Sequence, residues 1–293
     1  MKPLFTSLHT HTTLCDGKDD IETMCKAAYE KKLHAIGFSA HVPIEKQIGR
    51  KSDWNLKEEN VNEYVTQVNA AKKRWLGKLN VYLGFEADYI KGLRSPLDKD
   101  ITSLKPDYII GSTHFVSPKN GASPFTVDGP IEEFDKGLKE GYNGDAQALM
   151  NDYYSTQIEM IKAGGFDILG HADIIKKNCY GKNLWHQESE IERQRETAKA
   201  AAEKGIIIEV NTGAINQKRL NEVYPSLSFL CIIREFDIPV VITSDAHKAE
   251  DINGNYEIAL QTLNLAGFKE HLIINGKINE KLMWKKEKII KKL

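Results

Sequence analysis

The sequence contains little cysteine, and its cysteines form no recognisable pair. The four thiols are scattered through 293 residues at Cys15, Cys25, Cys179 and Cys231. No C-x-x-C spacing occurs among them, so no disulfide framework is expected. We therefore expect free thiols and a reduced, cytoplasmic protein.

The chain also lacks a strong net charge and any long apolar run. The formal net charge is −1, so there is no basic field to hold nucleic acid, and we expect no nucleic-acid partner. The longest apolar runs are too short to cross a bilayer, which argues against membrane insertion. The N-terminal residues 1–5 lead directly into the first motif and are not expected to form a signal peptide.

What the chain does contain is one pattern of histidines and carboxylates spread over its whole length. Six of its nine histidines belong to this pattern. Almost every member ends a short apolar run, where a barrel strand would deliver the side chain to a shared mouth. Imidazoles and carboxylates gathered in this way hold divalent metals. The pattern therefore predicts a metal centre built from His9, His11, Asp16, His41, Glu86, His114, His171, Asp245 and His247.

Local spacing supports this interpretation. His9 and His11 are two residues apart, so in an extended segment both imidazoles point to one face. Gly17 permits a tight turn that would return Asp16 to the same place. A buried Glu86 would be costly unless it were paired or metal-bound, and its two oxygens could serve two cations. A single histidine at a strand end is more often structural, but nine residues in the same placement indicate metal binding.

Short apolar runs alternate with helical patterns along the chain. The runs predict strands at residues 4–8, 35–38, 81–85, 108–110, 168–169, 206–210 and 240–242. Helices are expected at 57–76 and 145–163, and capping-box spacings predict two more that open near Asp19 and Ser189, the second ending at Gly205. Seven strands alternating with helices predict an α/β fold, a distorted TIM-like (β/α) barrel. We expect one domain over residues 1–293, with the metal site at the C-terminal ends of the strands.

Two segments exceed a minimal barrel, and both follow strands on the ligand side. We expect 116–144 to wall or cover the site, whereas 43–56 is as readily explained as a plain surface excursion. The basic residues 285–292 predict a solvated helix face. His34, His186 and His271 stand outside the pattern, and His271 is expected to be exposed.

The motifs resemble those of the PHP (polymerase and histidinol phosphatase) superfamily of metal-dependent phosphoesterases, over essentially the whole chain. They are His9-Thr10-His11, Ser39-Ala40-His41, Phe85-Glu86, Thr113-His114, Gly170-His171 and Ser244-Asp245-Ala246-His247. Within the superfamily, stretches 111–115, 165–177, 209–213 and 222–226 are most similar to the histidinol-phosphate phosphatases. Residues 214–221 depart from that pattern. The resemblance implies a distorted (β/α)7 barrel.

The resemblance also implies two to three divalent metal ions, either zinc, iron or manganese. It implies a first metal on His9, His11, Glu86 and Asp245, a second on Glu86, His114 and His171, and a third on Asp16, His41 and His247. A hydroxide bridging two metals would hydrolyse a phosphate monoester. Asp245 or His247 would protonate the leaving group, and Lys176, Arg219 and Lys218 would contact the phosphate.

The substrate implied by this narrower resemblance is L-histidinol phosphate, cleaved to histidinol and phosphate in histidine biosynthesis. Asp128, Phe115 and Tyr224 are candidates for contacts with the histidinol part. A PHP phosphoesterase acting on nucleotides or another small phosphate ester would share every metal ligand. A degenerate interaction module attached to a polymerase would have lost ligands, yet all nine positions are filled here.

Overall fold

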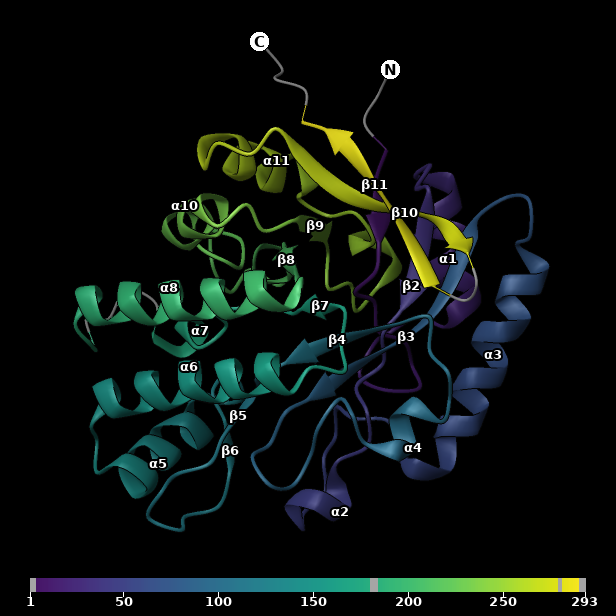
Figure 1. The fold of residues 1–293 in the computed structure, drawn as a ribbon. Coiled ribbons are helices and arrows are strands. Elements are labelled where there is room, and N and C mark those ends of the chain that lie inside the picture. The colour runs from purple at the N-terminus through teal and green to yellow at the C-terminus, as the bar shows by residue number, and fades with distance from the viewer. Residues whose placement is uncertain (1–3, 180–183, 279–280, 290–293) are drawn as a thin grey trace.

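One sheet organises the fold, and its strands follow each other in chain order. The computed structural model describes residues 4–179, 184–278 and 281–289. Among them, one nine-stranded sheet has the order β1-β2-β3-β4-β7-β8-β9-β10-β11 (Figure 1). Its strands are β1 Thr6–Ser7, β2 Ala35–Phe38, β3 Asn80–Asp88, β4 Tyr108–Ser112, β7 Ile168–Leu169, β8 Ile207–Asn211, β9 Val240–Thr243, β10 Glu270–Ile278 and β11 Lys281–Lys288. All seven predicted strands are present, each within two residues of the expected start.

The sheet curls until its first and seventh strands meet at their carboxyl ends. From β1 to β9 every neighbouring pair in the sheet is parallel. Just beyond β1 and β9, Thr10 and Ala246 form a parallel bridge. His11 N donates to Ala246 O at 2.9 Å, and Ala246 N donates to His9 O at 3.1 Å. The predicted distorted, TIM-like α/β architecture is confirmed, with the sheet joined to itself on the side of the predicted ligands.

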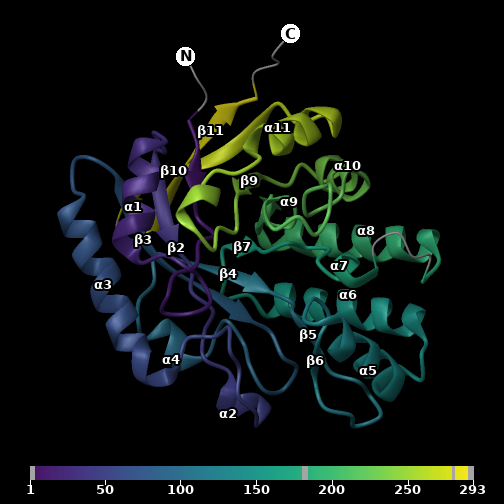
Figure 2. The same cartoon turned by 180° about the vertical axis from the view of Figure 1, so that it is seen from behind.

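Helices cover the outer face of the curled sheet. Figures 1 and 2 show α1 and α3 beside the early strands, and α6, α8, α10 and α11 beside the later ones. No helix within the described residues is long and apolar enough to cross a membrane. The helices are α1 Ile21–Glu30, α2 Glu45–Ile48, α3 Val61–Arg74, α4 Lys99–Thr102, α5 Ile131–Tyr142, α6 Ala146–Ala163, α7 Lys176–Cys179, α8 Gln187–Lys204, α9 Gly213–Asn216, α10 Leu227–Glu235 and α11 Tyr256–Leu265.

Helix ends were predicted less well than helix bodies. The expected helices at 57–76 and 145–163 are present as α3 and α6. The cap of α1 is Asp20, whose Oδ1 accepts from Thr23 N at 2.7 Å, and not Asp19. The predicted start near Ser189 is wrong, because α8 already begins at Gln187. Gly205 ends α8 in the left-handed conformation, as expected.

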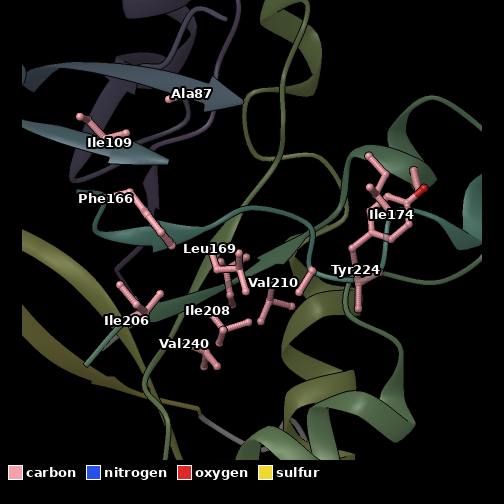
Figure 3. Packing of buried hydrophobic residues seen from close by; sticks show 14 of the residues in the cluster. Ala87, Ile109, Phe166, Leu169, Ile174, Ile206, Ile208, Val210, Tyr224 and Val240 are labelled. Atoms are coloured by element: carbon pink, nitrogen blue, oxygen red, sulfur yellow. The ribbon is translucent and has the colours of Figure 1, made fainter. Parts of the chain in front are cut away.

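The core has an outer layer between sheet and helices and a smaller cluster inside the barrel. Figure 3 shows part of the outer layer, where Phe166, Leu169 and Ile208 lie close together. Inside the barrel, Tyr108 crosses beneath two glycines. A Cβ at Gly37 or Gly84 would lie only 2.3 or 2.4 Å from the Tyr108 side chain, so this packing requires glycine at both positions. The interior cluster is Leu8, Ala35, Tyr82, Tyr108, Ile110, Ile168, Ile207, Val241 and Ile274.

The C-terminal segment is the largest departure from the predicted fold. The expected helix face at 285–292 is wrong as far as residue 288, because β10 and β11 form an antiparallel hairpin at the end of the sheet. Leu282 and Trp284 alternate with the exposed Lys281, Met283 and Lys285 and pack against the interior cluster. His271 is buried and stacks on Phe5 with ring centroids 5.7 Å apart, so its expected exposure is also wrong.

Candidate metal centre

The predicted metal ligands lie together at the carboxyl edge of the parallel strands. Asp16 lies in the loop after β1. In this loop Gly17 packs so closely on His11 that a Cβ at Gly17 would lie 2.5 Å from the His11 backbone. This close approach agrees with the tight turn expected there. The other ligands end or follow successive strands, namely His9 and His11 after β1, His41 after β2, Glu86 in β3, His114 after β4, His171 after β7, and Asp245 and His247 after β9.

The Glu86 carboxylate occupies the middle of this group. Its side chain is fully buried, and five imidazoles from four strand ends surround it. Oε1 also accepts a hydrogen bond from Ser112 Oγ at 2.6 Å. The imidazole nitrogens around the carboxylate are His171 Nε2 at 2.9 Å, His9 Nε2 and His41 Nδ1 at 3.0 Å, His114 Nε2 at 3.4 Å and His11 Nε2 at 3.6 Å.

The donor set fits several divalent cations. Five groups of three or four ligand atoms each lie within 4.8 Å of one another, and together they include all nine predicted ligands. His11 Nε2, His41 Nδ1, His171 Nδ1 and Asp16 Oδ1 are buried. Although carboxylate or imidazole atoms lie near some of them, none makes a hydrogen bond of suitable geometry among the described residues. Buried polar atoms are rarely left in this state. Mixed imidazole and carboxylate donors suit zinc, iron or manganese, so these residues are suited to hold such ions.

The charges within the cluster support the same interpretation. Burial by itself raises the pKa of the Glu86 carboxyl, but the surrounding imidazoles hold that pKa well below its usual range. Burial likewise lowers the pKa of His9, yet Asp245, Glu209 and Glu86 raise it well above its ordinary value. Glu86 is therefore ionised and needs cationic partners, which protonated imidazoles or bound metal ions can supply.

The geometry brings together the members of each predicted ligand set. Asp245 Oδ1 lies 3.5 Å from His9 Nε2 and 3.2 Å from His11 Nε2, beside Glu86. Asp16 Oδ2 lies 3.1 Å from His247 Nε2 and 3.9 Å from His41 Nε2. Glu86, His114 and His171 form a group of their own. The three sets of ligands therefore lie together in one site, and the first two share Glu86.

Two buried carboxylates behind the ligands were missed from the sequence. Asp88 accepts from His114 Nδ1 at 2.8 Å, and Glu209 accepts from His9 Nδ1 at 2.6 Å. Such contacts orient metal-binding imidazoles. The sequence features that could have identified these two carboxylates were weak. Asp88 shares a strand face with Glu86 two residues earlier, and Glu209 is the one charged residue in the apolar run 206–210.

A cavity of about 460 Å³ opens beside the ligand cluster. The expectation that 116–144 walls the site is confirmed, since Thr126, Asp128 and Glu133 line the cavity. The segment 43–56 does the same through Arg50 and Trp54, so it is more than a surface excursion. Within 116–144 the lining residues come from the strand β6 Phe125–Thr126, from the loop 128–130 and from α5, and β6 pairs with β5 Phe115–Val116.

The positive side chains around this cavity differ from those predicted. Lys176 does not line it, because its ammonium lies 3.1 Å from Asp173 and 3.0 Å from Glu222 and donates to Val223 O. Lys218 does not line it either. Arg219 does, as predicted, and it is joined by three side chains that sequence reasoning missed, Arg50, Lys51 and Lys177. Lys176 and Lys177 are the first two residues of the short helix α7. The orientation of this helix determines that Lys177, and not Lys176, faces the cavity.

Acidic side chains, among them Asp128, and several aromatic rings complete the lining. Asp128 Oδ2 lies 3.4 Å from Lys177 Nζ. Burial raises the pKa of Asp128, but Lys177 and His114 outweigh burial and lower that pKa, so the carboxyl is ionised. Trp54 and Phe115 stack with centroids 5.9 Å apart, and the buried Tyr224 hydroxyl has no partner among the described residues.

Comparison with curated proteins finds relatives over most of the chain. A probable histidinol-phosphatase from Deinococcus radiodurans is 27% identical over 260 residues, covering 88% of this chain and 92% of that protein. A histidinol-phosphatase from Bacillus subtilis is 24% identical over 266 residues, covering 86% and 97%. Proteins named probable phosphatase from Clostridium botulinum are 28% identical over 207 residues, covering 70% and 67%.

Solved structures share the fold. A putative histidinol phosphatase from Listeria monocytogenes superposes with a TM-score of 0.75 at 23% identity, covering 86% of this chain and 98% of that one. The histidinol phosphate phosphatase of Lactococcus lactis, solved with zinc, L-histidinol and phosphate, gives a TM-score of 0.67 at 18% identity, covering 96% and 99%. The PHP domain model matches residues 7–213, from the last residue of β1 to the first residue of α9. The chain belongs to the PHP domain family.

Proposed function

We propose that this protein is a metal-dependent phosphatase that hydrolyses L-histidinol phosphate to L-histidinol and phosphate. The observation that carries the proposal is the convergence of five imidazoles on the buried Glu86 carboxylate, beside a cavity ringed with cationic side chains. Relatives that match more than four fifths of the chain are named histidinol-phosphatase or probable histidinol-phosphatase. Both facts point to one reaction class.

Three divalent ions would be held by the residues around Glu86. The first would bind His9, His11, Glu86 and Asp245, the second Glu86, His114 and His171, and the third Asp16, His41 and His247. When bound, such ions neutralise phosphate oxygens and make a water-derived nucleophile available at neutral pH. The protein's part is to fix these side chains in a buried, pre-organised arrangement.

Cationic side chains of the cavity would bind the phosphate oxygens. Lys177 and Arg219 belong to the segments that follow β7 and β8, whereas Arg50 and Lys51 belong to the segment 43–56 that follows β2. A phosphate monoester carries up to two negative charges, and charge-assisted hydrogen bonds to it are short and strong. We assign Lys177 and Arg219 the main role. Lys177 takes the role of phosphate contact that the sequence suggested for Lys176, because the Lys176 ammonium is paired with Asp173 and Glu222.

The remaining lining suits a leaving group that is cationic and planar. Histidinol carries an amine and an imidazole. The ionised Asp128 can pair with an ammonium group, and the rings of Trp54, Phe115 and Tyr224 can pack against an imidazole. Proteins named only as probable phosphatases match over a shorter length, so a different small phosphate ester is the alternative substrate.

We assign proton transfer to the leaving oxygen to Asp245 rather than His247. Burial by itself raises the pKa of Asp245, but the neighbouring histidines hold that pKa well below its usual range. Its ionised carboxylate would therefore first take up the proton that the attacking water loses and then pass it to the leaving oxygen. His247 Nδ1 lies 3.0 Å from the carbonyl oxygen of Asp245, which can only accept. The imidazole proton is therefore held at Nδ1, and Nε2 is left facing Asp16. Asp245 lines the cavity and has an oxygen within reach of a substrate.

The test is phosphate release from L-histidinol phosphate by chelated and reconstituted protein. Chelated protein is expected to be inactive, and adding zinc, iron or manganese should restore turnover with saturation near three equivalents. Turnover that survives complete removal of metal would refute the proposal.

Three further expectations stay predictions. They are a single domain over residues 1–293, a cytoplasmic location and the lack of a nucleic-acid partner. The first agrees with the one sheet that runs from β1 to β11.

A further inference from the structure

Glu209 is a fully buried carboxylate that belongs to none of the groups of ligand atoms. It lies in β8, directly behind the metal centre, and both of its oxygens are engaged. Oε1 accepts from His9 Nδ1 and Thr243 Oγ1, each at 2.6 Å. Oε2 accepts from the backbone N–H of His171 at 2.8 Å and from Asn211 Nδ2 at 3.0 Å.

These contacts link residues that approach the metal centre from two different strands. His9 follows β1 and His171 follows β7, and each also contacts the Glu86 carboxylate, on opposite oxygens. His171 has a positive φ of 20°, a conformation that residues with a side chain rarely adopt. Its N–H is held by Glu209 Oε2. One carboxylate therefore fixes an imidazole ring on one side and a strained backbone on the other.

The contact with His9 also decides which ring nitrogen carries the proton. A carboxylate oxygen can only accept, so Nδ1 of His9 carries a proton, against Glu209. Nε2 lies 3.0 Å from Glu86 and 3.5 Å from Asp245, and it would be the nitrogen left to present a lone pair to a bound ion. An imidazole must present such a lone pair to bind a metal, and the partner of its other nitrogen sets the tautomer.

We propose that Glu209 is a positioning residue of the metal centre, which holds His9 in its metal-binding tautomer and clamps the backbone of His171. The proposal rests on the proposed metal-dependent function. It adds a role for a residue that contacts neither metal nor substrate but acts through ligands of the first two ions. The third set, Asp16, His41 and His247, makes no contact with Glu209 within the part of the chain that the structure describes.

The test is Glu209→Gln, which keeps the shape of the side chain and reverses one hydrogen bond. The glutamine oxygen would keep the two donors that face Oε2, since His171 N–H and Asn211 can only donate there. Its amide nitrogen would then face His9 Nδ1 and donate to it. In the neutral ring the imidazole proton would then lie on Nε2, on the metal side, where it would oppose binding of the first ion.

Zinc binding to the chelated full-length protein is the readout, measured by competition with a chromophoric chelator. Loss of a contact of this kind weakens metal binding roughly 10- to 100-fold. We expect such a loss for the two equivalents that use His9 or His171, with the third equivalent unchanged.

Asp107→Asn is the matched control. Asp107 is also a buried carboxylate in contact with several donors, namely Leu83 N, Lys72 and Lys277, but it lies at the opposite end of β4 from the ligands. D107N should lower the melting temperature without changing zinc affinity. If E209Q and D107N lose stability alike and both bind zinc like the wild type, Glu209 is merely structural and the proposal is overturned.

Glu209→Asp keeps the test decisive if E209Q does not fold. The shorter side chain keeps the charge but cannot reach His9 and His171 together, so zinc should still bind at least tenfold more weakly than in the wild type. Wild-type affinity in E209D would overturn the proposal. A wild-type protein that binds no zinc, iron or manganese would instead refute the proposed metal-dependent function, and this inference with it.

Discussion

The guanidinium of Arg50 lies 2.6 Å from the carboxylate of Glu133, and this ion pair joins two segments that are 83 residues apart in the chain. Arg50 belongs to the segment 43–56 and Glu133 to the segment 116–144, the two excursions that wall the cavity. Both side chains are partly exposed, at 48% and 28%. A pair in such surroundings contributes less than about 1 kcal/mol to stability, so its main consequence is the placement of a positive charge at the mouth.

Replacing Arg50 by alanine should weaken binding of the phosphate ester and leave the fold intact. We expect kcat/KM to fall about tenfold, mainly through KM, which corresponds to about 1.4 kcal/mol. Steady-state kinetics and a thermal melt measure the two effects. Glu133→Gln is the control, because it leaves the Arg50 charge in place and should have a smaller effect. Equal losses in both variants would show that the ion pair itself, rather than the cation, is what matters.

Replacing Glu86 by glutamine should disrupt the first two metal sites together. Glu86 is the carboxylate that two ligand sets share, and an amide cannot offer two anionic oxygens. We expect bound metal, determined by elemental analysis, to fall by about two equivalents, and kcat to fall by more than about 1,000-fold, equivalent to about 4 kcal/mol. Circular dichroism should be almost unchanged. Near wild-type turnover in E86Q would contradict the central place given to this residue.

The neighbouring lysines 176 and 177 should respond oppositely to substitution. Lys176→Met leaves the buried Asp173 carboxylate unpaired and should cost about 3 kcal/mol of stability. Its KM should change little, because the Lys176 ammonium does not line the cavity. Lys177→Met should raise KM and leave the unfolding free energy within about 1 kcal/mol of the wild type. Chemical denaturation and kinetics on the two variants test the assignment, which fails if K176M rather than K177M raises KM.

Metal binding should tighten as the pH rises, whereas the metal-free protein should lose stability. Burial lowers the pKa values of His9 and His11, but nearby carboxylates raise both pKa values well above their ordinary range. A raised pKa stabilises the metal-free fold below the unfolded value of about 6.5, and that contribution is lost as pH climbs through the folded pKa. Metal must displace these protons. The increase in melting temperature on adding zinc should therefore grow between pH 6 and pH 8.5, and a constant increase would contradict this picture.

The residues that carry chemistry were predictable, while much of their surroundings was not. His9, Glu86 and Asp245 each end an apolar run, and parallel strands bring such ends to one edge, so their meeting followed from sequence order. The orientation of α7, which chooses Lys177 over Lys176, depends on packing that spacing cannot reveal.

The supporting carboxylates and the C-terminal hairpin were not predicted from the sequence, for related reasons. Glu209 is a charged residue inside a buried strand, and its role depends on partners up to 200 residues away. The hairpin strand β11 carries lysines on its exposed face, so composition suggested a helix, while Leu282 and Trp284 alternate with period two against the barrel interior. The lysine-rich charge pattern suggested a solvated helix, and it was given more weight than the short apolar alternation of Leu282 and Trp284.

The most direct test of the account is the selectivity of the metal-loaded protein among phosphate esters. Phosphate release would be compared for L-histidinol phosphate, nucleoside monophosphates, an aryl phosphate and a phosphodiester at equal metal content. We predict a kcat/KM for L-histidinol phosphate at least about 100-fold above the others, which needs about 2.7 kcal/mol of differential transition-state binding. Weak and indiscriminate hydrolysis by fully loaded protein would contradict the assignment of this substrate.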